Sequence, residues 1–308
     1  MKKFYIIDAS AILHRSWHAL PHLKNNRGET INAVYGFTSV LLKILNQEKP
    51  PFLAIAFDTK APTFRHQAYK EYKANRVTQP PELYQQIPWV KKILDSLSLK
   101  SFSCPGLEAD DLIGALDAAK EQFSQNLKSH IITGDLDLLQ LVREETEVCF
   151  LQQGLKAKKI YNSFEVQKRF GVTPQQITDF KALVGDTADN IKGVKSVGPK
   201  TAAFLIQKFK NLENIYQYLT KNQKKEENLI KNSLKKKLLE DKDKVFLNKR
   251  LVTIQKKAPN INSHTISECQ IKKINTEKAF SALSEIGLKK FSQKIKEMEQ
   301  GLKQDKLF

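Results

Sequence analysis

The sequence has few of the residues that mark several common classes of protein. Its three cysteines, Cys104, Cys149 and Cys269, are scattered without a Cys-x-x-Cys pair, so neither a disulfide framework nor a zinc site is expected. No run of about 18 apolar residues is present that could span a membrane, and the apolar part of the first residues is too short for a signal peptide. We therefore expect a protein of the cytoplasm with reduced cysteines and no membrane partner.

Familiar nucleotide-binding and nucleophile motifs are missing as well. The chain has no P-loop, no convincing GxGxxG segment and no Ser, His and Asp in an order typical of hydrolases. Three of its six histidines, His14, His18 and His22, recur at four-residue spacing, which is compatible with a metal-binding helix face. Because Trp17 and Pro21 lie among them, we favour a packed or partly exposed surface and keep the metal-binding face as the alternative.

Basic residues are in large excess. The chain of 308 residues carries 51 Lys and Arg against 33 Asp and Glu, a formal net charge of +18, and 41% of its residues are hydrophobic. The hydrophobic share is that of a globular protein, and the length allows one large domain or two smaller ones. The charge favours a polyanionic partner, although a solvated lysine-rich surface would give the same excess.

Short apolar runs alternate with helical patterns in the first half of the chain. Strands separated by helices predict a mostly parallel sheet that is covered by helices. The predicted strands are 3–8, 52–58, 100–104, 129–135 and 146–151, and helical patterns cover 31–45 and 109–123. From about Ser163 onward the pattern predicts helices only, including a lysine-rich stretch at 224–244 with a sparse Leu and Ile stripe.

Acidic residues occur where the predicted strands end. Asp8, Asp58 and Asp135 close three strands, and Glu108 comes four residues after a fourth. Because the carboxyl ends of parallel strands share one edge of a sheet, these side chains should converge there. Five further acids lie next to them or in a later "GDTADN" segment: Asp110, Asp111, Asp137, Asp186 and Asp189.

Nine acids at one edge require neutralisation. Any single one could be a helix N-cap worth about 1 kcal/mol, but unpaired like charges a few ångströms apart repel by several kcal/mol at an effective dielectric near 20. Protons or cations must therefore accompany them. A ligand set made only of oxygen selects hard ions such as Mg²⁺ or Mn²⁺, and two such ions in a basic protein indicate phosphodiester chemistry.

Two basic segments accompany the acids. In 63–76 cations are interleaved with tyrosines, a pattern that suits single-stranded nucleic acid, although a solvated amphipathic helix is the alternative. The residues of interest there are Arg65, Lys70, Tyr72, Lys73 and Arg76. In 193–202 the glycines of a helix–loop–helix would let backbone N–H groups and lysines hold duplex phosphates, the alternative being an ordinary helical turn. Its key residues are Gly193, Lys195, Gly198 and Lys200.

Five segments together resemble the 5′-nuclease, or flap endonuclease, family. They are "IIDASAILHR", "AFDTKAPTFRHQAYKEYKANR", "GLEADDLIG", "ITGDLDLLQL" and "LVGDTADNIKGVKSVGPKTA". Their order and spacing are most similar to the 5′→3′ exonuclease domain of bacterial DNA polymerase I over residues 3–220, with weaker likeness at 245–255. Because no polymerase segment follows, the chain resembles a stand-alone form of that domain.

The resemblance implies a fold and a domain organisation. The fold is α/β, with a mostly parallel central sheet covered by helices in the PIN-like arrangement of 5′-nucleases, followed by an all-helical helix–hairpin–helix region. Residues 1–162 would form the metal-dependent nuclease core, with a helical arch around 60–92. Residues 163–258 would form the helical DNA-binding region with its hairpin loop at 191–200, and 259–308 a C-terminal extension and tail.

The resemblance also implies the roles of site residues. Two or more Mg²⁺ ions, with Mn²⁺ as a substitute, would bind a first cluster of Asp8, Asp58, Glu108, Asp110 and Asp111 and a second of Asp135, Asp137, Asp186 and Asp189. Lys73, Arg76 and Asp111 would be catalytic. DNA contacts would come from Arg15, Arg65, Lys70, Tyr72, Gly193, Lys195, Gly198 and Lys200, and K⁺ would bind at the hairpin loop.

The implied activity is that of a monomeric, structure-specific 5′→3′ exonuclease and flap endonuclease, acting on DNA flaps, nicks and ends and on RNA-primed DNA in replication and repair near the bacterial nucleoid. The terminal "QDKLF" resembles a sliding-clamp docking peptide through Gln304, Leu307 and Phe308, with a chance match as the alternative. Two other classes were weighed: a DNA-binding module without catalysis, and a shorter carboxylate-cluster ribonuclease. The full acid set disfavours the first, and the arch and hairpin motifs disfavour the second.

Overall fold

A six-stranded sheet organises the computed structural model, which describes residues 1–151, 158–220 and 230–296. The strand order is β3-β2-β1-β4-β5-β6. Five strands are parallel, and β6 runs antiparallel to β5 at one edge. The strands are β1 (Lys2–Asp8), β2 (Phe52–Ala56), β3 (Lys100–Phe102), β4 (Leu127–Thr133), β5 (Thr146–Leu151) and β6 (Lys158–Tyr161). The predicted α/β fold with a mostly parallel sheet is confirmed.

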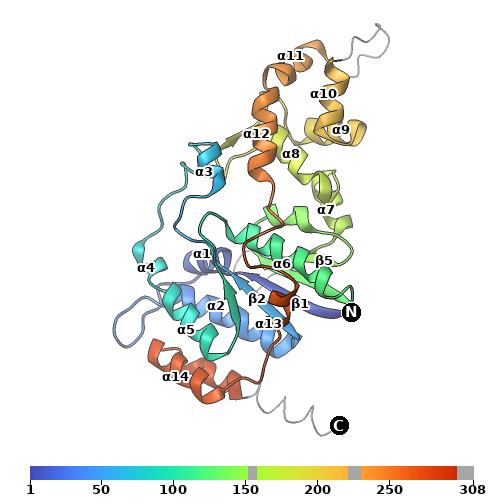
Figure 1. The fold of residues 1–308 in the computed structure, drawn as a ribbon. Helices are drawn as coiled ribbons and strands as arrows, with labels where there is room; N and C mark the ends of the chain where they lie inside the picture. The colour runs from blue at the N-terminus through green and yellow to red at the C-terminus, as the bar shows by residue number, and fades with distance from the viewer. Residues whose placement is uncertain (152–157, 221–229, 297–308) are drawn as a thin grey trace.

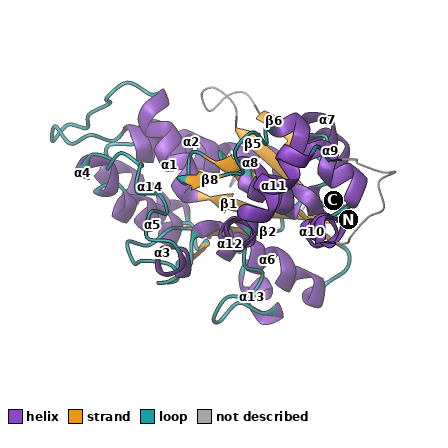
Figure 2. Cartoon of the chain, turned by 90° about the horizontal axis from the view of Figure 1, so that it is seen from above, coloured by secondary structure: helices purple, strands orange, loops and turns teal. Residues whose placement is uncertain are grey.

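Helices cover both faces of this sheet (Figure 2). Alternate residues of β1 separate two hydrophobic clusters: Phe4 and Ile6 belong to one, and Tyr5 and Ile7 to the other. Burial on both faces explains why this strand reads as a continuous apolar run. On the Tyr5 face lie α1 (Ala9–Ala19), α2 (Asn32–Lys43) with its π-helical continuation η1 (Ile44–Glu48), and α5 (Ile87–Ser96); on the Phe4 face lies α6 (Ala109–Phe123).

The predicted arch joins β2 to α5. It contains two short helices, α3 (Phe64–Ala68) and α4 (Pro81–Tyr84). In Figure 1, α3 lies high, beside α12 of the helical region, while α4 lies lower, beside the helices of the core. The segment therefore bridges the two parts of the molecule.

The second part of the chain is built from helices stacked above the carboxyl ends of the strands (Figure 1). They are α7 (Ser163–Phe170), η3 (Pro174–Gln176), α8 (Ile177–Val184), α9 (Pro199–Phe209), α10 (Leu212–Thr220), α11 (Asn232–Glu240) and α12 (Lys242–Val252). A short helix of the sheet region, η2 (Asp137–Leu141), joins β4 to β5. Two features differ from the prediction. A small antiparallel pair, β7 (Gly185–Asp186) and β8 (Ile191–Lys192), interrupts the helices, because the chain reverses at the acidic segment between them. The edge strand β6 was also missed, since its lysine-rich sequence lacks the apolar run of the buried strands.

Residues 259–296 belong to the folded core. Helices α13 (Ser263–Glu268) and α14 (Thr276–Ile286), with η4 (Lys289–Phe291), pack back on the sheet region. Ala279, Leu283 and Ile286, at helical spacing, join the cluster on the Tyr5 face, and the Leu53 N–H donates to the Cys269 carbonyl at 2.9 Å. The expected C-terminal extension is therefore integrated as far as residue 296. Gln304, Leu307 and Phe308 lie outside the described residues, and none of the described helices has the length and apolar character to cross a membrane.

Candidate active site

Asp8 sits at the junction of the central strand with its first helix. It ends β1 and caps α1: Oδ1 accepts from the Ala11 N–H at 2.9 Å, and Oδ2 accepts from the Thr133 hydroxyl at 2.7 Å. The residue is only 3% exposed. Burial, and then the charge of Asp58, raise the pKa of Asp8 to about 7. A carboxylate in this position is therefore costly unless a cation or a proton accompanies it.

Asp58 and Asp110 extend the acidic edge across to helix α6. Asp58 Oδ1 accepts from the Ala109 N–H at 2.8 Å, and so satisfies one of the free amides at the start of α6. Asp110 lies in the first turn of that helix. Burial, and then the charges of Asp135 and Asp8, raise the pKa of Asp110 well above its ordinary value. These electrostatic couplings show that acids from four different elements lie near one another at this edge.

Four of these acids have no basic partner among the residues that the structure describes. In the ranges 1–151, 158–220 and 230–296 the structure records no ion pair with Lys or Arg for them. They come from β1, from the loops after β2 and β4, and from the start of α6. We call them the central carboxylates: Asp8, Asp58, Asp110 and Asp135.

Four other acids surround them and are each paired with a lysine or arginine. Lys181, from α8, bridges Asp137 and Asp186, with 2.7 Å from its Nζ to Asp186 Oδ2. Lys73 and Arg76, from the arch, pair with Glu108 Oε2 at 2.9 Å and with Asp189 Oδ1 at 2.6 Å. We call this set the paired carboxylates: Glu108, Asp137, Asp186 and Asp189.

The arch is fastened to the loop that carries Asp189. Lys73, at a φ of 56°, donates its backbone N–H to the Asp189 carbonyl at 3.0 Å, and Asn75 Nδ2 donates to the Thr187 carbonyl at 2.8 Å. Burial would raise the pKa of Asp189, but Lys73 and Arg76 outweigh it and hold that pKa below its ordinary value. Two of the paired carboxylates, Glu108 and Asp189, therefore anchor the arch.

Tyr72 is part of the same anchor. Its hydroxyl lies 3.2 Å from Glu108 Oε2 and 2.9 Å from Asp189 Oδ2. Only 3% of the residue is exposed, so its ring is enclosed by protein. The structure thus differs from the expectation that Tyr72 contacts DNA, because the arch folds this ring inward over the acids.

Arg65 and Asp111 form a buried ion pair, and neither reaches the open edge. Arg65 Nη1 and Nη2 donate to the two Asp111 oxygens at 2.7 and 2.8 Å, and the side chains are 3% and 0% exposed. This departs from the expectation that Arg65 binds DNA and that Asp111 binds metal and acts in catalysis. Both oxygens of Asp111 are already engaged, because the arch places a guanidinium against them.

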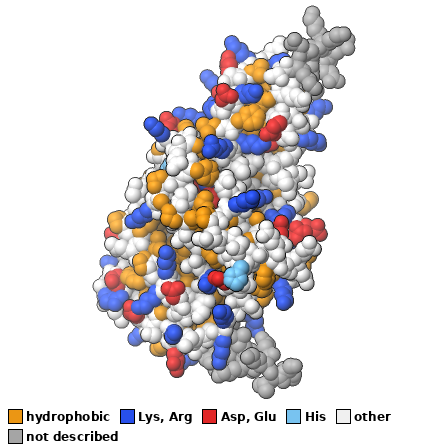
Figure 3. All heavy atoms as spheres, in the orientation of Figure 1, with side chains coloured by type: hydrophobic (Ala, Val, Ile, Leu, Met, Phe, Trp, Pro, Cys, Tyr) orange, Lys and Arg blue, Asp and Glu red, His pale blue; other side chains and the backbone are white. Residues whose placement is uncertain are grey.

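The remaining predicted DNA contacts fall into two groups. Arg15 packs over the Phe150 ring at 5.5 Å, with Nη2 3.4 Å from the Gly134 carbonyl, whereas Lys70 is exposed on the arch. In the hairpin loop Lys195 and Lys200 are exposed. Basic side chains are spread over the helical region and the sheet region alike, among acidic ones (Figure 3).

The two hairpin glycines serve different purposes. A Cβ on Gly193 would lie 2.2 Å from the Val184 carbonyl oxygen, so this glycine is required by close packing against the end of α8. A Cβ on Gly198 would meet no atom within 4 Å, and Gly198 is the N-cap of α9, with Pro199 at its first position. Only Gly198 leaves an open helix start that a phosphate could approach.

His14 on α1 and His22 in the loop after it make ring contacts typical of packing. His14 meets the Tyr84 ring edge-on at 6.2 Å, and Trp17 meets His22 at 5.2 Å. Burial lowers the pKa of His14. Among the described residues no three His, Cys, Asp or Glu side chains stand close enough to hold an ion as placed. A metal-binding histidine face thus gains no support.

The donor set at the acidic edge nevertheless suits hard divalent cations. It consists of carboxylate oxygens only. Two of these carboxylates, buried Asp8 and half-buried Asp110, have raised pKa values and no ion pair with Lys or Arg among the described residues. Such oxygens are the ligands that Mg²⁺ and Mn²⁺ prefer.

Two residues of the site were missed from sequence. Lys181 holds two acids, and Gln140, on η2, donates through Nε2 to the Asp137 carbonyl at 2.9 Å. A signal existed for Lys181, which is a lone cation in an otherwise apolar helix face five residues before Asp186. Nothing in the local sequence marks Gln140.

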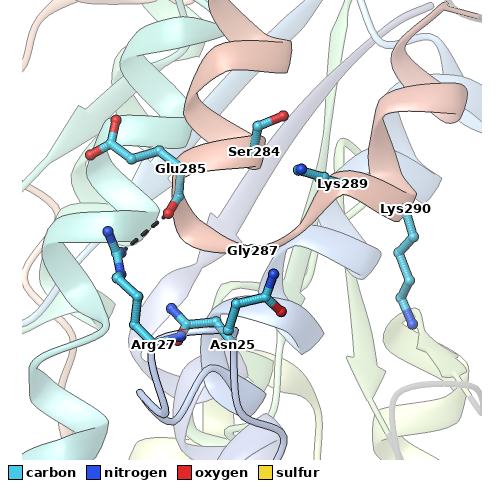
Figure 4. A pocket seen from close by; sticks show the side chains of 8 residues that line it. Asn25, Arg27, Ser284, Glu285, Gly287, Lys289 and Lys290 are labelled. Atoms are coloured by element: carbon cyan, nitrogen blue, oxygen red, sulfur yellow. Dashed lines mark hydrogen bonds between the residues drawn. The ribbon is translucent and has the colours of Figure 1, made fainter.

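A hollow outside this site lies between residues 25–29 and the end of α14 (Figure 4). Asn25 Nδ2 donates to the Ile286 carbonyl at 3.2 Å, and Arg27 Nη2 donates to the Glu285 carbonyl at 3.1 Å. These bonds fasten the loop to the helix end, and we interpret the hollow as the seam between the two segments.

Both parts of the chain match models of known protein families. Residues 3–171 match the family model described as 5′-3′ exonuclease, N-terminal resolvase-like domain, and residues 172–277 match that described as 5′-3′ exonuclease, C-terminal SAM fold. A 5′-3′ exonuclease of Aquifex aeolicus is 40% identical over 225 residues, which are 73% of this chain and 75% of that protein. DNA polymerase I of Bacillus subtilis is 35% identical over 304 residues, 99% of this chain. The chain spans 33% of the length of that polymerase.

Solved structures share the fold at low sequence identity. The D15 protein of phage T5, co-crystallised with metal ions, has a TM-score of 0.66 at 18% identity, covering 97% of this chain and 100% of its own. The catalytic core of Rad2 in complex with a DNA substrate has a TM-score of 0.63 at 18% identity, covering 98% of this chain and 92% of its own. These similarities extend over both the sheet and the helical region.

Proposed function

This chain belongs to the 5′-3′ exonuclease family, and we propose that it hydrolyses phosphodiester bonds near 5′ ends of DNA, where duplex meets single strand. The observation that carries the proposal is the set of central carboxylates beneath a cationic arch. Acids facing a phosphate backbone would repel it, and Asp8 and Asp110 are costly as bare anions. Divalent ions bound between these acids would remove both the repulsion among them and their repulsion of the phosphate.

The proposed ion ligands are the acids of this edge other than Asp111. Asp8, Asp58, Glu108 and Asp110 would hold one ion, and Asp135, Asp137, Asp186 and Asp189 a second. Mg²⁺ fits this oxygen-only set, and Mn²⁺ is the substitute. When bound, two such ions lower the pKa of a water and stabilise the leaving oxygen of an in-line displacement.

The arch supplies the cations that hold the substrate. Lys73 and Arg76 are paired with Glu108 and Asp189 in the free protein. When other cations neutralise those acids, the ammonium and guanidinium groups become available to bind and orient the scissile phosphate. Asp111 has no part in this step, because both its oxygens remain with Arg65.

The helical region would hold the duplex. Lys195 and Lys200 are exposed on either side of Gly198, where α9 begins. Backbone N–H groups at a helix start bind phosphates without reading base sequence. A K⁺ ion held by carbonyls of this loop belongs to the same proposal.

The proposed substrates are 5′ flaps, nicks, duplex ends and RNA-primed DNA in replication and repair. The setting is a monomer in the bacterial cytoplasm at the nucleoid. The fold neighbours include a T5 protein co-crystallised with metal ions and Rad2 in complex with a DNA substrate, which supports a metal-dependent action on DNA. Docking on a sliding clamp through residues 304–308 is part of the proposal, and deletion of these residues should abolish capture by immobilised clamp; undiminished capture would exclude it.

Cleavage of end-labelled junctions tests the function. Flap, nick and blunt substrates carrying a 5′ label should be cut in Mg²⁺ and remain intact in EDTA, with the flap and nick cut faster than the blunt duplex. Exposed Asp95 on α5 offers a matched control: Asp95→Asn should cut like the wild type, whereas Asp110→Asn should not. Tight junction binding without Mg²⁺-dependent cleavage would overturn the proposal in favour of a binding module.

A further inference from the structure

Residues 251–255, at and after the end of α12, cross the start of α6. We call this segment the strap. A Cβ on Gly114 would lie 2.6 Å from Ile254 Cγ2 and 2.8 Å from the Gln255 carbonyl oxygen. Contact this close requires glycine at 114 and leaves the strap no freedom to shift toward the helix.

Three side chains bind the backbone of the strap. Arg65, from arch helix α3, donates Nε to the Leu251 carbonyl at 2.8 Å and Nη2 to the Thr253 carbonyl at 3.1 Å. Asp111, from α6, accepts from the Gln255 N–H at 2.9 Å. Every bond is made to the main chain of the strap.

Gln140 supplies the third set of bonds. Its Nε2 donates to the Val252 carbonyl and its Oε1 accepts from the Ile254 N–H, both at 3.0 Å. Together with the bonds of Arg65 and Asp111, these engage a main-chain group of each of the five strap residues. Side chains that grip a backbone at every residue hold its position more tightly than apolar contact alone.

Each of the three side chains is also tied to a different part of the acidic edge. Asp111 Oδ2 accepts from the Glu108 N–H at 3.1 Å, and Gln140 Nε2 donates to the Asp137 carbonyl at 2.9 Å. Arg65 lies on the arch, eight positions before Lys73. The strap therefore touches the arch and both acid-bearing segments at once.

At its other end the strap continues into α12, which is fixed to the helical region. Asn248 Nδ2 donates to the carbonyls of Ala182 and Lys192 at 3.1 and 3.0 Å. Ala182 belongs to α8, and Lys192 precedes the hairpin loop. A continuous chain of bonds thus runs from the proposed duplex-holding loop through α12 and the strap to the acids.

We propose that the strap is the joint that sets the helical region in register with the acidic edge, and that Arg65, Asp111 and Gln140 are positioning residues for cleavage. This inference rests on the proposed function: the joint fixes which phosphate of a bound 5′ strand reaches the central carboxylates. None of the three contacts the phosphate. Loosening the joint should leave the affinity for duplex DNA unchanged but spread cleavage over several neighbouring phosphates.

Helix α6 provides a matched control for Asp111. Asp117, at the other end of the helix, is 1% exposed, accepts from the Thr146 hydroxyl at 2.9 Å and pairs with Arg143 Nη1 at 2.7 Å. It is therefore another buried aspartate paired with arginine on the same helix, and no bond between it and the strap is recorded among the described residues. Asp111→Asn and Asp117→Asn should lower the unfolding temperature by similar amounts.

The cleavage readouts separate the two variants. On a 5′-labelled flap we expect Asp111→Asn to keep the wild-type Kd within about twofold, to lose kcat by about 10²-fold, the cost of a misplacement near 1 Å, and to spread its cuts over neighbouring phosphates. Asp117→Asn should keep both the kcat and the single cutting position. Equal effects of the two substitutions, or an unchanged cut pattern in Asp111→Asn, would overturn the inference.

Gln140→Leu provides a second variant that leaves no buried charge unpaired. It should broaden the cutting position in the same direction as Asp111→Asn. Gln176→Leu is its control, because Gln176 also joins two backbone segments, Thr173 N–H and the Lys210 carbonyl, away from the strap. If Gln176→Leu broadened the cuts as much as Gln140→Leu, the strap would have no special role.

A distance measurement makes the inference independent of nuclease activity. Spin labels at exposed Lys43 on α2 and exposed Lys208 on α9, with Cys104 replaced by serine, report the separation of the two parts by double electron–electron resonance. The wild type and Asp117→Asn should give one narrow distribution, and Asp111→Asn a broader one. Identical distance distributions in the wild type and Asp111→Asn would refute the joint, even if the enzyme were active. If Asp111→Asn broadened the distribution but the wild type cleaved no substrate, only the proposed function would be refuted.

Discussion

The central and the paired carboxylates occupy the same sheet edge but are neutralised in different ways. In the described part of the chain, no lysine or arginine pairs with Asp8 or Asp110, whose pKa values are raised by burial and by neighbouring acids. Asp189 has the reverse property: its pKa is lowered, because Arg76 and Lys73 lie beside it. Among the described residues, the central carboxylates thus lack the lysine and arginine partners that the paired carboxylates have.

The difference separates two roles that the sequence merges. Uncompensated charge stores repulsion that a bound cation can relieve, which is the property expected of an ion site. In the ion-free protein, compensated charge holds the arch and α8 in place through Arg76 and Lys181. Acids at one sheet edge therefore need not be neutralised in the same way before an ion binds.

The largest effect is expected for Asp110→Asn. Loss of a central carboxylate should reduce cleavage by more than about 100-fold, beyond the range seen when only outer groups of a metal site change. The same substitution should stabilise the ion-free protein by about 1 kcal/mol, because it removes a buried, repelled charge. Turnover assays and thermal unfolding in EDTA check both; a variant that lost activity and stability together would place Asp110 with the paired set.

Asp189→Asn should change stability in the opposite direction. It removes the partner of Arg76 and weakens the Tyr72 bond, so unfolding in EDTA should become easier by about 1 kcal/mol, because Asp189 is buried but Arg76 is half exposed to water. Denaturant titration measures the change, with exposed Asp95→Asn as the neutral reference. An unchanged midpoint would show that the arch is held by other contacts.

Stability without divalent ions should depend on pH. The pKa of Asp8 is about 7 in the folded protein, above an unfolded value of about 3.9, so the folded state binds the extra proton between these values. Stability should therefore fall as pH rises from 4 to 7, by about 1 kcal/mol per unit for this group. Unfolding temperatures in EDTA measure this slope.

Two controls sharpen the pH prediction. Asp8→Asn should flatten the slope, because the titrating group is gone, and Mg²⁺ should restore stability mainly at the upper end of the range, where the carboxylates are ionised. A slope that persisted unchanged in Asp8→Asn would mean that another group is responsible.

The smallest effect concerns cations outside the acid edge. Lys195 is exposed, whereas Lys181 is bound to Asp137 and Asp186. Lys195→Ala should lower the salt dependence of duplex binding by about one phosphate contact, and Lys181→Ala should leave that slope unaltered. The slope of duplex affinity against salt concentration, measured for both variants, tests this prediction. A reduced slope for Lys181→Ala would show that Lys181 contacts DNA.

Much of the fold could be predicted because its signals are local. The apolar run of β1 and the helical spacing of α6 mark elements whose burial is continuous, and the acids at their ends mark one sheet edge. The strand β6 and the packing of α14 escaped prediction, since an edge strand lacks an apolar run and a helix does not reveal which core it joins. Of the site, the acids were visible, but not which of them have partners.

By itself the sequence determined the α/β order, the basic charge and the gathering of carboxylates, because each follows from residue type and spacing along the chain. Only the tertiary structure decided that Asp111 faces Arg65 while Asp110, one residue earlier, faces other acids. Consecutive residues of a helix point about 100° apart, so neighbours in sequence meet different partners. Those partners come from an arch 46 positions away and from a strap 144 positions away, distances that folding alone closes.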